Sequence, residues 1–154
     1  MQGDLWSFAL DLYARPGVEG ASLELQQAGA DVCVLICAAW LGQRGVPWRK
    51  EYLARLQLLA EPWQTDVISP LRHLRQQWRT AAQSNDELAT LREQVKALEL
   101  EAERQLLVRL EGLSMGWPPD AAAELELWLA QAVPAEARSN LGALQVLRAA
   151  IEPG

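Results

Sequence analysis

Hydrophobic residues recur at helical spacing along nearly the whole chain, and Gly and Pro interrupt this pattern at intervals. Leu, Ala, Gln, Glu and Arg dominate between the interruptions, whereas β-branched residues are sparse, a composition that favours helices over strands. The pattern predicts an all-α protein, a single-domain bundle of about eight helices over residues 1–154. The predicted helices cover residues 4–14, 18–28, 32–43, 48–60, 62–78, 85–111, 120–132 and 134–151.

Two of these predicted helices stand out. The helix over 32–43 begins with ten consecutive apolar residues, Val32 to Leu41, so it has almost no polar face and should be the buried centre of the fold. A membrane span would need roughly 20 apolar residues. The helix over 85–111 is the longest, roughly 40 Å at 1.5 Å per residue. Its pattern leaves open whether it packs back on the first half of the chain or projects from it.

Two features in the middle of the chain, a proline and a capping pattern, predict a bend and the start of a helix. Apolar residues keep a helical period straight through Pro70, so we expect a kinked helix, or two abutting helices, with the bend around Asp66–Pro70. Ser84 followed three residues later by Glu87 is typical of a capping box and predicts the start of the long helix.

Charge is distributed unevenly. The net charge is −6, which argues against non-specific binding to nucleic acid or to an anionic membrane. Residues 49–80 nevertheless carry six basic and three acidic side chains. Within them, Arg72, Arg75 and Arg79 form one helical stripe that could hold carboxylates or phosphates. Two interpretations stay open: pairing with acids of this chain, for example on the long helix, which we favour, or a surface for an acidic partner.

Other residues carry weaker indications. Trp48 and Trp117 lie beside prolines, where they could be exposed anchors for a partner or could close the ends of the core. Glu99 and Glu103 lie on the long helix among Arg and Lys, a pattern typical of a solvated face.

The sequence offers little catalytic chemistry. Cys33 and Cys37 share one face of the apolar helix, which predicts buried, reduced thiols and fits a cytoplasmic protein. His73 is the only histidine, and no metal-binding or catalytic motif accompanies it. No stretch resembles a signal peptide. We therefore expect no catalytic, cofactor or metal site and a cytoplasmic protein.

An ordered string of residues in the N-terminal half resembles a known family. The string consists of Trp6–Leu10, Leu12–Tyr13, Pro16–Val18, Leu25–Gln26, Gly29, Asp31–Val32, Trp40–Leu41 and Pro70–Arg72. It is similar to a proteobacterial family of small helical proteins known only as a domain of unknown function, over about the first 80 residues. The resemblance implies a small, bacterial, cytoplasmic protein and assigns no catalytic residue.

Three functions remain open at this stage. The first is a protein-interaction or regulatory module, with the Arg72, Arg75 and Arg79 stripe or the long helix as its surface; a homodimer through the long helix is one form of it. The second is a binder of an apolar small molecule between helices, which a cavity lined by Cys33, Cys37 and Trp40 would favour. The third is an enzyme of unfamiliar type. We favour the first because it needs no residue that the sequence lacks.

Overall fold

The computed structural model describes residues 4–120, 124–135 and 140–151, and within these ranges it contains helices and no strand. The predicted all-α fold is therefore confirmed. The α-helices are α1 (Leu5–Tyr13), α2 (Val18–Gln27), α3 (Val32–Gln43), α4 (Lys50–Trp63), α5 (Ser69–Gln77), α6 (Asp86–Ser114), α7 (Leu125–Gln131) and α9 (Leu141–Ile151). A π-helical turn, η1 (Gln64–Ile68), and a 3₁₀ turn, η2 (Ala81–Ser84), complete the described elements. Parts of the last two predicted helices, residues 121–123 and 136–139, lie outside the described residues.

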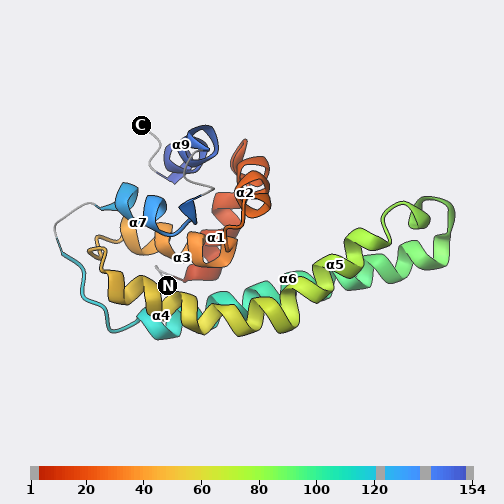
Figure 1. The fold of residues 1–154 in the computed structure, drawn as a ribbon, viewed down its shortest axis with the longest axis horizontal. Coiled ribbons are helices and arrows are strands. Elements are labelled where there is room, and N and C mark those ends of the chain that lie inside the picture. The colour runs from red at the N-terminus through yellow and green to blue at the C-terminus, as the bar shows by residue number, and fades with distance from the viewer. Residues whose placement is uncertain (1–3, 121–123, 136–139, 152–154) are drawn as a thin grey trace.

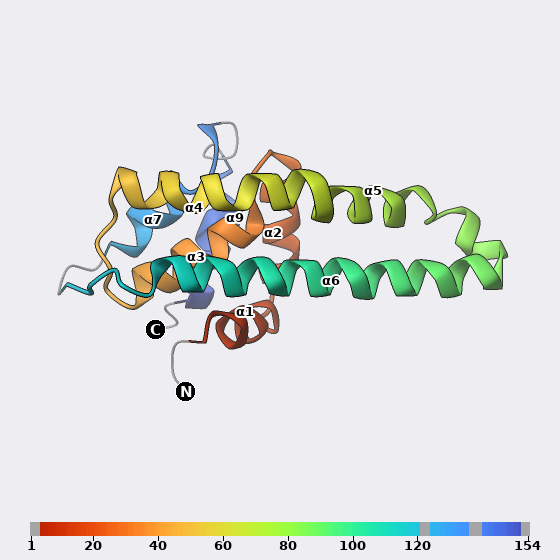
Figure 2. The same ribbon diagram turned by 90° about the horizontal axis from the view of Figure 1, so that it is seen from below.

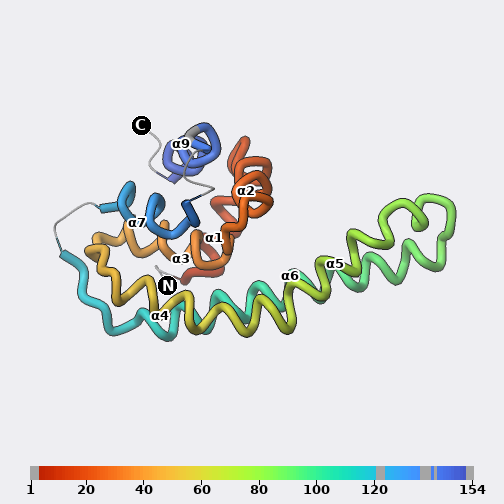
Figure 3. The backbone as a smooth tube through the Cα atoms, viewed as in Figure 1, coloured from red at the N-terminus to blue at the C-terminus, as the bar shows by residue number. Residues whose placement is uncertain are grey.

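The elements form a head and a projecting arm (Figure 1). Helices α1, α2, α3, α7 and α9 make up the head, whereas α5, η2 and the N-terminal half of α6 make up the arm. α4, η1 and α5 follow one nearly continuous path that runs antiparallel to α6, as the second view and the backbone tube show (Figures 2 and 3). With 29 residues, α6 is about 43 Å long. It is long enough to pack on the head with one half and to project with the other, so both alternatives for this helix hold.

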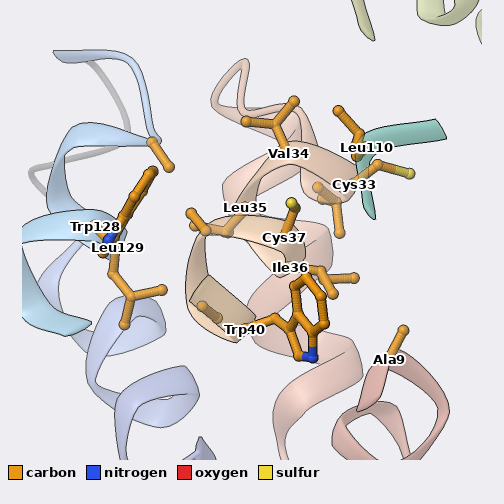
Figure 4. Packing of buried hydrophobic residues seen from close by; sticks show 14 of the residues in the cluster. Ala9, Cys33, Val34, Leu35, Ile36, Cys37, Trp40, Leu110, Trp128 and Leu129 are labelled. Atoms are coloured by element: carbon orange, nitrogen blue, oxygen red, sulfur yellow. The ribbon is translucent and has the colours of Figure 1, made fainter. Parts of the chain in front are cut away.

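Helix α3 is the centre of the core, as its apolar sequence predicts. Every residue from Val32 to Gly42 is buried. Figure 4 shows side chains leaving α3 on several sides, towards Trp128 of α7, Leu110 of α6 and Ala9 of α1. Because no face of α3 reaches water, its neighbours are arranged around it.

The contact between α3 and α7 depends on a glycine. A Cβ atom on Gly42 would lie 2.8 Å from the Cα of Leu125, so only glycine permits this approach of the two backbones. Trp128 of α7 is fully buried, and its indole N–H donates to the carbonyl of Val46 at 2.7 Å. These contacts fix α7 against the end of α3.

At the predicted bend, the chain forms a π-helical turn between two abutting helices. α4 continues through Pro62 to Trp63 and then widens into the π-helical turn η1, where the N–H of Ser69 donates to the carbonyl of Gln64. α5 begins directly afterwards, with Pro70 in its first turn. The predicted helix boundary near residues 60–62 is therefore wrong. Gln64 also donates from Nε2 to Asp31 Oδ1 at 2.9 Å, which ties the turn to the head.

The start of α6 is one residue later than the capping box predicts. Asn85 is the N-cap, and its Oδ1 accepts from the N–H of Leu88 at 3.1 Å, while Ser84 belongs to η2. Asn85 has the extended backbone that an N-cap needs.

Leu91 and Leu98, further along α6, are exposed. The homodimer through this helix stays a prediction. None of the described helices combines the length and the apolar character that crossing a bilayer requires.

Candidate functional site

A groove of about 650 Å³ occupies the corner between the head and the arm. α1, α2 and the first turns of α3 line one side, and α5 and α6 line the other. We call it the corner groove. Its larger apolar side chains are Trp6, Leu10, Leu23, Val32, Ile36, Leu100 and Leu107. Its charged side chains are Glu19, Arg72, Arg75, Glu93, Lys96, Glu99 and Glu103.

Four charges on the arm side form one cluster. Arg72 and Arg75 lie three residues apart on α5, and Glu99 and Glu103 four residues apart on α6, so each pair shares one face of its helix. Glu99 is only 6% exposed. Its Oε2 accepts from Arg72 Nε at 3.0 Å, and its Oε1 accepts from Arg75 Nε at 2.5 Å. The expectation that Glu99 is solvated is wrong, because the pairing of α5 with α6 turns it towards the two guanidinium groups.

Glu103 is held more loosely than Glu99. Its Oε2 accepts from Arg72 Nη2 at 3.3 Å. Burial raises the pKa of Glu103 to about 6, and the Glu99 carboxylate adds to this increase, while Arg72 opposes it. At neutral pH Glu103 therefore carries a negative charge that its surroundings only partly stabilise.

Arg72 also connects the arm with the head. The carboxamide of Gln26, on α2, lies against its guanidinium group, and with its oxygen facing Arg72 it accepts from Nη2 at 2.9 Å. One arginine thus reaches Glu99 and Glu103 of α6 and Gln26 of α2. Bonds in three directions fix its position in the groove.

The head contributes groups that stay protonated. Burial raises the pKa of Tyr13 above its ordinary range, and Ser22 is hydrogen bonded to its hydroxyl. Burial also raises the pKa of the Cys33 thiol, with Asp31 and Glu103 adding to the effect. A thiol that stays protonated is a poor nucleophile. Among the described residues, no group of His, Cys, Asp and Glu is placed to hold a metal ion. Burial therefore leaves the Tyr13 hydroxyl and the Cys33 thiol protonated on the head side of the groove.

The structure separates the residues that the sequence singled out. Arg72 and Arg75 lie together in the corner groove, whereas Arg79 is exposed beyond α5, outside the lining of this groove, and has no ion pair within the described ranges. Trp117 is only 9% exposed, and its ring stacks on Tyr52 at 4.0 Å. The interpretation of Trp117 as an exposed anchor is wrong, because the chain after α6 folds against α4.

Trp48 lies at a different place again. It is half-buried and lines a second groove, of about 500 Å³, between α3, α4 and the end of α7. Its indole N–H is buried and finds no acceptor among the described residues. The role of Trp48 as an anchor for a partner stays a prediction.

The sequence contained one unused signal for the corner groove. A basic pair at a spacing of three precedes an acidic pair at a spacing of four, and a turn separates the two helices. In an antiparallel hairpin such pairs can face each other. Tyr13 and Gln26 carry no comparable signal, because only the packing of α1 and α2 brings them to the arm. Of the residues predicted to line an apolar cavity, Cys33 lines this groove, and Cys37 and Trp40 do not.

Comparisons with known proteins agree with the sequence resemblance. The family described as "Protein of unknown function (DUF2390)" matches residues 4–110. No curated protein matches the chain. No solved structure matches it either. The residues that line the corner groove, from Trp6 to Leu107, all fall inside the matched range, whereas the second groove takes its last residues from beyond it. The chain therefore belongs to the DUF2390 family, whose matched range includes the whole corner groove.

Proposed function

We propose that this protein is a non-catalytic interaction module and that the corner groove is its binding surface. One observation carries the proposal: Leu10, Leu23 and Leu100, from three different helices, are 51%, 50% and 53% exposed around the same groove. Single exposed leucines are ordinary, but apolar side chains gathered at a groove with polar groups at its base are typical of a binding site.

The shape of the groove favours a protein segment over a small molecule. Sites for small molecules bury about 70–90% of the ligand surface. Here the apolar walls are half open to solvent, so a small ligand would stay in wide contact with water. A segment of a partner protein can cover all three leucines at once. The buried thiols, which are not paired in a disulfide, support a cytoplasmic location for this interaction.

Nile red, a neutral dye whose fluorescence rises on exposed apolar surfaces, tests whether the leucines around the groove form an apolar surface that a partner can reach. We expect the wild-type protein to bind the dye and the variants Leu23→Ser and Leu100→Ser to lose most of this binding. Leu58→Ser is the matched control, because Leu58 is 75% exposed on α4 and does not line the groove. Unchanged dye binding in both groove variants, or an equal loss in the control, would contradict the proposed function.

A further inference from the structure

We infer that the occupant of the corner groove is an amphipathic helix of a partner protein, which lays apolar side chains on the three leucines and directs a lysine or arginine towards Glu103 and Glu19. This inference rests on the proposed function, because it names the partner of the same groove. It follows from the kind of surface that borders the groove and from the charge left inside it.

The walls of the groove favour a ligand that binds through its side chains. Helices form its walls, and no strand edge occurs among the described residues. An extended segment could therefore gain no main-chain hydrogen bonds by adding a strand. A helix satisfies its own backbone and presents apolar side chains at spacings of three and four residues. Leu10 and Leu23 on the head and Leu100 on the arm provide opposite walls for such a stripe.

The charges of the groove do not balance. It contains four carboxylates and three cationic groups. Both arginines are already bound to Glu99, and Arg72 is also shared with Glu103. Lys96 lies 3.6 Å from Glu93. Glu19 is exposed and has no ion pair within the described part of the chain. The charge that remains for a ligand is therefore negative, and a cationic side chain complements it.

Glu103 gives the interaction a measurable signature. It faces Arg72 and Arg75 from α5, Glu99 from its own helix, and Asp31, Cys33 and Tyr13 from the head, while Lys96 lines the same groove further along α6. Of these groups, the tyrosine and the thiol stay protonated. A cation from a partner would favour the ionised form of Glu103 and keep its proton off. Binding should therefore weaken when acid protonates this carboxylate.

Two model peptides of equal length test the inference, one built from Leu and Lys and the other from Leu and Glu at the same helical spacings. Binding of each labelled peptide to the full chain is measured by fluorescence anisotropy. We expect the Leu/Lys peptide to bind and to displace Nile red, and the Leu/Glu peptide to do neither. Glu103→Gln should weaken the Leu/Lys peptide about tenfold and remove most of the loss of affinity between pH 8 and pH 5.

Glu101→Gln is the matched control, because it removes the same charge from the exposed face of the same helix. Equal weakening by Glu101→Gln would reduce the result to general attraction by an acidic protein and would overturn the inference. Binding of Nile red without displacement by the Leu/Lys peptide would contradict the inference that the occupant is a helix. The groove would then be a site for a small molecule. Failure of Nile red itself to bind would instead count against the proposed function.

Discussion

Glu99 Oε1 accepts a hydrogen bond of 2.5 Å from Arg75 Nε, although Glu99 is almost fully buried and Arg75 is not. The second guanidinium, that of Arg72, holds the other carboxylate oxygen at 3.0 Å. No residue of α5 is fully buried, and Leu71 packs against the core while only partly buried. The ion pairs around Glu99 are therefore a principal contact between the two helices of the arm.

Replacing Glu99 should destabilise the protein more than replacing any exposed acid of α6. Glu99→Gln leaves two guanidinium groups facing a neutral amide in a site that water hardly reaches. We expect a loss of about 1–3 kcal/mol in the free energy of unfolding, measured by urea denaturation. Glu101→Gln, on the exposed face, should cost less than about 0.5 kcal/mol. Equal effects of the two substitutions would show that the cluster contributes no more than a surface pair.

The stability of the protein should depend on the ionisation of Glu103. Its pKa is about 6 in the folded protein and near the ordinary 4.5 in the unfolded chain. Between these values the folded state binds more protons than the unfolded state, so the free energy of unfolding falls as pH rises through this window. The difference between the two pKa values corresponds to about 2 kcal/mol.

Glu103→Gln isolates this contribution, because glutamine cannot ionise. Urea denaturation of the wild type and the variant at pH 4 and pH 7.5 measures it. The variant should gain stability relative to the wild type as pH rises, by up to about 2 kcal/mol. A difference that stays constant across this range would mean that Glu103 has an unshifted pKa.

The sequence predicted the elements better than it predicted their contacts. The apolar run of α3 has no polar face, and so its central place follows from composition alone. The burial of Glu99 does not follow from composition, because a glutamate among lysines and arginines is typical of a solvated face. Only the register of α5 against α6 shows that it is buried. Trp117 lies next to Pro118, a position typical of a loop. Its burial depends on the contact with Tyr52, which is distant in sequence.

Truncating the centre of α3 should leave a cavity that the core cannot close. Leu35 is 1% exposed and is surrounded by other buried apolar side chains. Leu35→Ala should lower the free energy of unfolding by about 2–5 kcal/mol. Thermal and urea denaturation measure this loss, with Leu58→Ala on the surface of α4 as the control. A loss well under 1 kcal/mol would show that α3 is not the centre of the core.

The two thiols should react slowly while the protein is folded. Cys33 and Cys37 are both buried, and burial raises the pKa of each. Labelling by a thiol reagent at pH 8 should be slow in buffer and rapid in denaturing urea. Fast labelling of both residues in buffer would mean that α3 opens readily to solvent.

The π-helical turn η1 places one more residue between α4 and α5 than a regular helix would hold over the same length. In an α-helix each residue turns the following face by about 100°. The extra residue therefore rotates α5 about its axis and sets the direction in which its side chains point. Deleting a single residue from η1 would restore a regular helix and rotate Arg72 and Arg75 away from Glu99. The number of residues in η1 thus helps to decide which side chains line the corner groove, although η1 itself contributes none of them.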